Sequence, residues 1–155
     1  MIATLLLAAT LAGVGPDPTA APADAHPPVA YKILTRAEKE TLETSGRFEG
    51  SAKDLEDGFV HLSSESQLKR TADLHFAGQS DLFVAAVDLR AAGASVKWEL
   101  SPRSGQWFPH LYGVLEKSLV TGLEPLHRDG DGRVALSAAL KAPVVAPPRP
   151  GEGAR

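Results

Sequence analysis

The alternation of apolar and polar positions divides the middle of the chain into short strands, with helical segments placed early. The longest apolar run, LFVAAVDL at Leu82–Leu89, has the length and composition of a strand buried in a core. Shorter runs predict strands at Tyr31–Leu34, Phe59–Leu62, Val96–Leu100, Trp107–Leu115 and Ser118–Pro125. Pro109 predicts an edge strand or a bulge, because proline has no N–H to give to a sheet ladder.

Capping residues place two helices between these strands. Thr35 can cap a helix over about Arg36–Thr44. Ser63 or Ser64 can cap a second helix, which ends at Gly78. Short strands combined with two early helices indicate an α+β fold rather than a regular βαβ repeat.

Turn residues separate the remaining elements. Ser51–Asp54 leads into a turn at Asp57-Gly58, and the sequence DGDG at 129–132 predicts another turn. Ser101–Gln106 is polar and predicts a loop between two strands.

The two ends differ from the middle. The opening run MIATLLLAATLAGVG is shorter than the roughly 20 residues that span a bilayer, but it has the length of a signal-peptide core. Ala23-Asp24-Ala25 has the form of a cleavage site, although no Lys or Arg precedes the apolar run. We therefore expect a leader and linker over 1–29, one domain over 30–141 and a disordered Pro/Gly-rich tail over 142–155. An exported or periplasmic location is favoured, with a cytoplasmic one as the alternative.

Composition excludes several classes of protein. The 155 residues are 43% hydrophobic and 23% charged, which is typical of one globular domain. The net charge of −3, without a basic cluster, argues against binding to duplex nucleic acid. The absence of cysteine excludes disulfides and thiolate chemistry, and neither a metal-binding motif nor a G-x-S-x-G elbow occurs. We expect no membrane span in the mature protein, and the oligomeric state stays open.

The segment DGFVHLSS at 57–64 carries the first candidate site. In an extended strand Phe59, His61 and Ser63 share one face. A buried imidazole without a partner costs roughly 1–3 kcal/mol, so His61 is either a core residue bonded to backbone or a pocket residue that contacts a phosphate or ribose. Ser63 and Ser64 can cap a helix and also bind a ligand. The pattern F-x-H-L recurs at 108–111, which could place two histidines similarly on two strands.

A second group of candidates lies on the later strands. His110 and Tyr112 are two residues apart and should project together, where they could sandwich a flat ring or simply pack in the core. Glu99 lies between apolar neighbours, where burial would raise its pKa and suit acid–base chemistry. The alternative for Glu99 is a salt bridge to Lys97 or Arg103.

Several short motifs occur together in a characteristic order. They are YKI at 31–33, GRFEGS at 46–51, DGFVHLSS at 57–64, TA at 71–72, HFAG at 75–78, DL at 81–82, VD at 87–88, KWE at 97–99 and FPHLYG at 108–113. Over about Tyr31–Pro125 the chain resembles the DUF952 family, which comprises small, mostly bacterial domains of unknown function.

This resemblance implies a compact relative of the ADP-ribosyltransferase fold, with a split antiparallel or mixed sheet and two or three helices. Enzymes of that fold bind NAD between the two half-sheets. They use a first-strand His or Arg followed by a hydroxyl, a second-strand hydroxyl or aromatic, and a later Glu. Here the first strand carries Lys32 and Thr35 but no His or Arg, and a Glu is available only if Glu99 substitutes in space.

The predicted site therefore combines both groups. His61 and Glu99 are the candidate catalytic residues, and the candidate ligand-binding residues are Ser63, Ser64, His110, Tyr112, Lys32 and Thr35. The predicted function is a small-molecule pocket for NAD or another nucleotide. Whether it is an ADP-ribosyltransferase-like enzyme stays open. The alternative is a non-catalytic binding or interaction module, which would be exported if the leader is a signal peptide.

Overall fold

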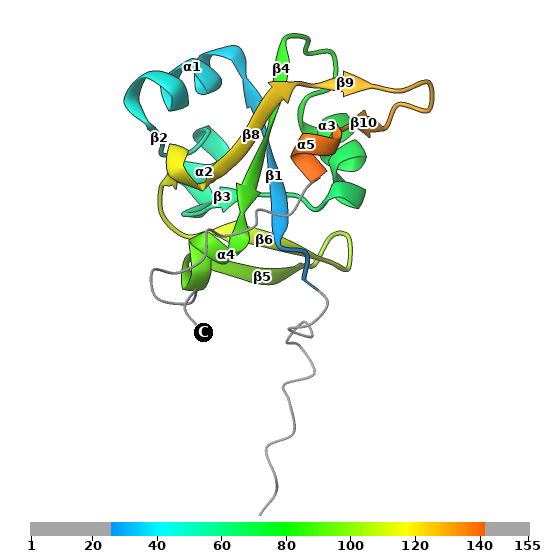
Figure 1. Cartoon of the computed structure of the whole chain (residues 1–155). Helices are drawn as coiled ribbons and strands as arrows, with labels where there is room; N and C mark the ends of the chain where they lie inside the picture. The colour runs from blue at the N-terminus through cyan, green and yellow to red at the C-terminus, as the bar shows by residue number, and fades with distance from the viewer. Residues whose placement is uncertain (1–25, 142–155) are drawn as a thin grey trace, which may run out of the picture.

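Two three-stranded antiparallel sheets form the frame of the protein, which was studied as a computed structural model that describes residues 26–141 (Figure 1). The first sheet has the order β1-β4-β8, with β1 at Val29–Thr35, β4 at Leu82–Asp88 and β8 at Val120–Pro125. The second has the order β3-β6-β5, with β3 at Val60–His61, β6 at Gln106–Leu111 and β5 at Val96–Ser101. The expected leader, its cleavage site and the tail from 142 lie outside the described residues.

The remaining elements surround this frame. The helices are α1 at Arg36–Ser45, α2 at Ala52–Asp57, α3 at Leu68–His75, α4 at Leu89–Ala92 and α5 at Ala138–Lys141. Short 3-10 segments occupy Glu65–Gln67, Gly93–Ser95 and Lys117–Leu119. Two small antiparallel pairs join β2 (Arg47–Phe48) to β7 (Leu115–Glu116) and β9 (His127–Arg128) to β10 (Val134–Ala135). The mixed α+β class predicted from the sequence is confirmed.

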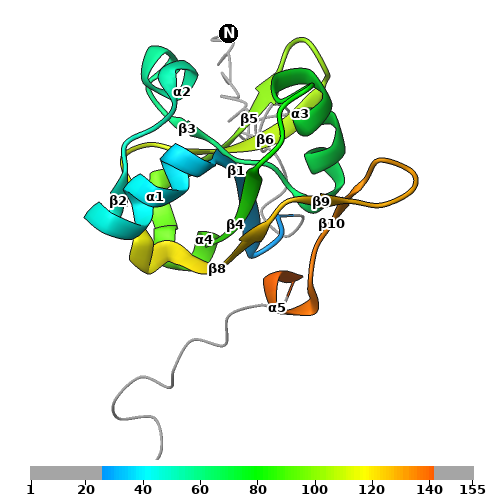
Figure 2. The same ribbon diagram turned by 90° about the horizontal axis from the view of Figure 1, so that it is seen from above.

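Strands β1 and β4 of the first sheet are buried on both faces. Viewed from above, α1 and α3 lie on opposite sides of β1 and β4 (Figure 2). One apolar cluster joins Ala30 and Leu34 to the α1 side, and another joins Tyr31 and Ile33 to α3 and α5. Because both faces are covered, β4 has an almost uninterrupted apolar sequence, as expected for a strand of this kind.

Within residues 26–141, one isolated backbone bridge, between Tyr31 and Ser63, connects the two sheets. The N–H of Tyr31 donates to the carbonyl of Ser63, and the N–H of Ser63 donates to the carbonyl of Tyr31, both at 2.8 Å. The middle of β1 is thereby fixed beside the segment that follows β3. The candidate site residues on these two segments are brought together at this bridge.

The predicted cap of the first helix is confirmed. The Thr35 hydroxyl accepts a hydrogen bond from the backbone N–H of Glu38, and the Glu38 carboxylate accepts one from the N–H of Thr35. The helix ends at Gly46, whose φ of 74° is in the left-handed region that favours glycine.

The segment expected to lead into a turn is instead a short helix. Ser51 caps α2, and the chain turns at Gly58 after a helix of 6 residues. The second predicted helix is shorter than expected: α3 ends at His75, whereas the sequence predicted an end at Gly78. The strand expected over Trp107–Leu115 stops at Leu111, and a separate short strand, β7, follows.

The expectation that Pro109 marks an edge strand or a bulge is wrong, because β6 is the central strand of its sheet. Pro109 is opposite Trp98 of β5, and its carbonyl accepts from the N–H of Leu62 at 3.0 Å. The N–H and C=O of a strand residue point to the same side, so the missing N–H is on the β3 side. Since β3 ends at His61, the sheet loses little by having no donor there.

No helix within residues 26–141 is both long and apolar enough to cross a membrane.

Candidate functional site

A pocket of about 360 Å³ lies at the bridge between the two sheets. Its walls come from β1, α1 through Glu38, α2, β3 with the segment after it, α3 and β6. Its polar lining residues include Lys32, Ser51, Lys53, Asp54, His61, Ser63, Thr71 and His75, and its aromatic lining residues are Tyr31, Phe76 and Phe108. The pocket is thus built from segments that are far apart in the sequence.

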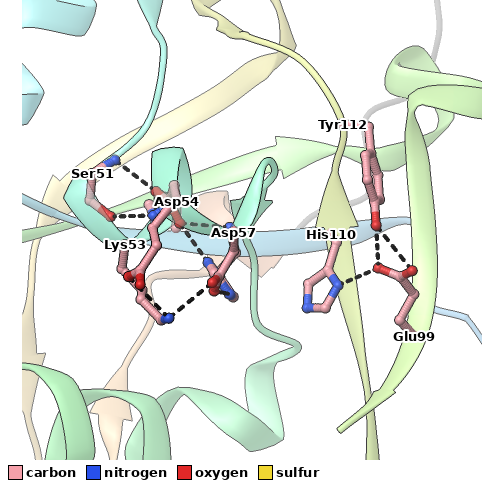
Figure 3. Close-up of polar contacts among 10 residues, drawn as sticks. Ser51, Lys53, Asp54, Asp57, Glu99, His110 and Tyr112 are labelled. Carbon is pink, nitrogen blue, oxygen red and sulfur yellow. Dashed lines mark hydrogen bonds and ion pairs between the residues drawn. The ribbon is translucent and has the colours of Figure 1, made fainter.

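Asp54 is the buried hub of the polar wall, with only 2% of its surface exposed. Its Oδ2 contacts the Nζ of Lys32 at 2.7 Å and accepts from the N–H of Ser51 at 2.9 Å. Its Oδ1 accepts from the N–H of His61 at 3.0 Å and lies 2.7 Å from the Nδ1 of the same histidine. Figure 3 shows Ser51 in contact with Asp54. Asp54 therefore ties α2 to β1 and to β3.

The buried pair of Lys32 and Asp54 follows from the strand register. Lys32 lies on the same face of β1 as the core residues Ala30 and Leu34, and it is 7% exposed. A buried ammonium group is stable only if a counter-charge and hydrogen bonds compensate its loss of water. The sequence supplies this counter-charge from α2, 22 residues away.

These contacts determine the charge state of Asp54. Burial raises the pKa of its carboxyl group, but the hydrogen bonds from His61 and the nearby charge of Lys32 lower it by more. The net pKa lies well below the usual range of an aspartate. The Asp54 carboxylate is therefore ionised at neutral pH and is acceptor-only.

We expect acid to weaken the fold through Asp54. A group whose pKa is lower in the folded state stabilises the fold above its unfolded pKa of about 3.9, and this contribution is lost as the pH falls through the folded-state value. The free energy of unfolding should decrease from about pH 5 downward, and the decrease should be smaller in Asp54→Asn. Urea denaturation at a series of pH values measures both slopes. Equal slopes would show that other carboxyl groups cause the acid sensitivity.

His61 is held at both ring nitrogens by carboxylates. Nδ1 faces Asp54, and Nε2 lies 3.0 Å from the Oδ2 of Asp57. Asp57 in turn contacts the Nζ of Lys53 at 2.9 Å. The Asp54 contact fixes the orientation of the imidazole, because a carboxylate oxygen accepts a hydrogen bond from Nδ1–H. The nitrogen left for a ligand or a reacting group is therefore Nε2.

A second polar cluster lies on β5 and β6, and Figure 3 shows it beside the first. The Nδ1 of His110 donates to the Oε2 of Glu99 at 2.6 Å. The hydroxyl of Tyr112 donates to the same carboxylate at 2.9 and 3.0 Å. The expectation that His110 and Tyr112 project together is confirmed, since both reach Glu99.

The repeated F-x-H-L pattern does place two histidines similarly. His61 and His110 are directly opposite each other across β3 and β6, and their ring centroids are 5.3 Å apart. Phe59 stacks on His110, with ring centroids 4.0 Å apart and an interplanar angle of 18°. Because Phe59 covers a face of His110, a flat ligand ring cannot be sandwiched there without moving Phe59.

The expectation that burial raises the pKa of Glu99 is wrong. The hydrogen bond with His110 lowers the pKa of Glu99, and burial offsets this effect only partly. The side chain is 40% exposed, so the loss of water is small. The contacts of this carboxylate are with His110 and Tyr112 rather than with Lys97 or Arg103. For His110, burial is the largest influence, and it lowers the pKa of the imidazole.

The other predicted residues divide into two sets. Lys32, His61 and Ser63 line the pocket, and Ser63 shares a hydrogen bond of 2.9 Å with the hydroxyl of Thr71. Thr35 caps α1, and Ser64 lies on a separate, open hollow, where its N–H donates to Gln67 at 3.0 Å.

Sequence reasoning missed several members of the pocket region, and Lys53, Asp54, Asp57 and Thr71 are among them. Asp54 was assigned to the segment before a turn and Asp57 to the turn itself, and Thr71 was not considered as a partner of Ser63. Two signals could have found Asp54. The spacing S-x-x-D from Ser51 is typical of a helix N-terminus, and Lys32 in an apolar strand needs a buried carboxylate.

Metal binding is not indicated by the geometry. Within residues 26–141, no group of three or more His, Asp or Glu side chains is arranged to hold a metal ion.

Fold and site together define a small α+β domain that carries a pocket with one polar wall between two antiparallel sheets. The chain belongs to the DUF952 family of proteins of unknown function, whose family model matches residues 33–123. The crystal structure of protein CC0527 from Caulobacter crescentus is 46% identical, with a TM-score of 0.65, and the match covers 74% of this chain and 99% of that one. The solution NMR structure of CC0527 is 48% identical, with a TM-score of 0.60, and covers 69% and 91%. None of the curated proteins compared with the chain matches it.

Proposed function

We propose that the pocket binds a nucleotide-class small molecule, NAD-related compounds included. The observation that carries this proposal is the combination of groups in one pocket: an oriented histidine, a pair of hydroxyls and aromatic rings. His61 and His75 can donate to phosphate oxygens, Ser63 and Thr71 can bond to ribose hydroxyls, and Phe76 and Phe108 offer faces or edges for a base. A volume of about 360 Å³ falls within the range usual for small-molecule sites.

We also propose that the two sheets correspond to the split sheet of an ADP-ribosyltransferase-like fold. The bridge between Tyr31 and Ser63 supports this, because it joins the sheets where both residues line the pocket. A ligand between half-sheets would occupy the same position. The proposal concerns fold and ligand position, since a fold by itself does not carry an activity.

A second candidate function is ADP-ribosyl transfer. Glu99 lies on the same sheet as His61, and His110 is between them, in contact with both. The pKa of Glu99 is lowered, so its carboxylate stays ionised. An ionised carboxylate is needed to stabilise an oxocarbenium-like centre. However, Glu99 is not among the lining residues of the pocket. Binding without chemistry is therefore better supported than transfer.

We expect His61→Ala to weaken nucleotide binding at least about tenfold, because a hydrogen bond to a charged group is worth roughly 1.5–3 kcal/mol. Ligand-observed NMR with NAD, ADP-ribose and AMP measures this directly. His127→Ala is the matched control, since His127 is exposed on β9 and does not line the pocket. Circular dichroism must show that both variants are folded.

The outcomes separate the candidates. Binding by the wild type and by His127→Ala but not by His61→Ala supports the pocket. Slow release of nicotinamide from NAD by the wild type would support transfer if the Glu99→Gln variant does not release it. Absence of binding by the wild type to all three compounds would contradict the nucleotide proposal.

A further inference from the structure

Two nitrogen atoms contact Asp57 at the edge of the pocket, and the imidazole nitrogen is a donor when His61 carries a proton on both ring nitrogens. The Nε2 of His61 lies 3.0 Å from its Oδ2, and the Nζ of Lys53 lies 2.9 Å from its Oδ1. Both donors line the pocket, whereas Asp57 itself does not. One carboxylate thus contacts nitrogen atoms of two side chains that line the pocket.

These contacts have the form of an anion-binding site. A carboxylate and a phosphate accept hydrogen bonds from the same donors and in similar geometry. We propose that His61 and Lys53 form an oxyanion site, which Asp57 occupies when the pocket is empty and which the anionic group of a ligand takes over when it binds. Asp57 would then be a built-in competitor that sets the affinity of the pocket. This inference rests on the proposed ligand pocket and extends it to the anion that the pocket selects.

The two donors differ in how firmly they are held. Asp54 fixes Nδ1 and the backbone N–H of His61, so Nε2 keeps its place when its partner is exchanged. Lys53 is 61% exposed and can follow a new partner. It also contacts Glu56 at 3.3 Å, so it has a second acceptor on the solvent side.

Asp57 is placed so that it can leave. It is the last residue of α2, followed by Gly58 with a φ of 85°, and its side chain is 26% exposed. Partly exposed ion pairs of this kind contribute little to stability, so little is lost when an incoming anion replaces the carboxylate. The hydrogen bond from Lys53 lowers the pKa of Asp57, which keeps it charged and therefore competitive.

Inorganic phosphate is the simplest probe of this site. In ¹H–¹⁵N spectra of the histidine side chains at about pH 6, phosphate should shift the Nε2 signal of His61 in the wild type. Asp57→Asn removes the competing charge with little change in shape and should tighten phosphate binding about fivefold. Glu56→Gln is the matched control, because it removes an equal charge one residue away, from a carboxylate in contact with Lys53 but not with His61. Its affinity for phosphate should stay within about twofold of the wild type.

A second variant tests the other donor. Lys53→Met should weaken phosphate binding both in the wild type and in Asp57→Asn. The inference is overturned if Asp57→Asn binds phosphate no better than Glu56→Gln, or if phosphate leaves His61 unshifted in Asp57→Asn. It is also overturned if Lys53→Met has no effect.

The same titration with AMP distinguishes this inference from the proposed function. If phosphate binds in the predicted order but AMP binds no more tightly than phosphate, the oxyanion site stands and the nucleotide proposal fails. If AMP binds at His61 with an affinity that Asp57→Asn does not change, the nucleotide proposal stands and the role of Asp57 fails.

Discussion

Asp54→Ala is expected to lower the free energy of unfolding by about 3–5 kcal/mol, which is the usual cost of removing one partner from a buried ion pair. The substitution leaves the ammonium group of Lys32 buried without a counter-charge. It also removes the acceptor for the N–H groups of Ser51 and His61. The effect is large because one carboxylate satisfies several donors, the buried ammonium group of Lys32 among them.

Urea denaturation followed by circular dichroism measures this change. Glu56→Ala is the control on the same helix, and it should cost less than about 0.5 kcal/mol because the Glu56 side chain is 72% exposed. Lys32→Met tests the origin of the cost, since the double variant should lose less than the sum of the two single changes. A cost for Asp54→Ala close to that of Glu56→Ala would show that Asp54 does not hold these segments together.

Sequence patterns predicted the first sheet well because burial on both faces leaves a strong local signal. The observed end of β4, Asp88, differs by one residue from the predicted end, Leu89. The cap at Thr35 correctly predicted where α1 starts. The helix α2 was missed because AKDLED has no apolar stripe. Its single large apolar residue, Leu55, is 62% exposed, so the helix depends on its cap and on the contacts of Asp54 rather than on a buried face.

The candidate site was predicted only where strand alternation or a repeated motif indicates which residues lie together. The face shared by His61 and Ser63 follows from strand alternation, and the pairing of His61 with His110 matches the repeated F-x-H-L pattern. The contact of Asp54 with Lys32 joins residues 22 apart and depends on how α2 lies against β1. Neither periodicity nor spacing encodes such a contact, although the need of a buried lysine for a counter-charge does suggest that one exists.

The environment of Glu99 shows a further limit of local reasoning. Its apolar neighbours Trp98 and Leu100 suggested burial, but successive residues of a strand point to opposite faces. Neighbours in sequence therefore say little about the surroundings of a strand residue. The relevant neighbour is His110, which reaches Glu99 from the adjacent strand and lowers the pKa of its carboxyl group.

Gly50→Ala is expected to lower the free energy of unfolding by about 3 kcal/mol, from backbone strain and a steric clash together. Gly50 has a φ of 130°, a backbone conformation that residues other than glycine rarely adopt. A Cβ there would lie 2.7 Å from the Cβ of Asp54, closer than two carbon atoms can approach without a shift. The atom it would strike belongs to the hub of the pocket, so the substitution should disturb the site as well as the fold.

Gly58→Ala, at the other end of α2, separates the two causes. Gly58 also has a positive φ, 85°, but an added Cβ would meet no heavy atom of residues 26–141 within 4 Å. It should therefore show the cost of strain alone, about 1–2 kcal/mol. We expect the Nδ1 signal of His61 to move in Gly50→Ala and to stay in place in Gly58→Ala, because only the first change pushes Asp54 away from the imidazole. If both variants lose equal stability and leave His61 unchanged, Gly50 serves only the turn before α2, and close packing against Asp54 is not what keeps the histidine in position.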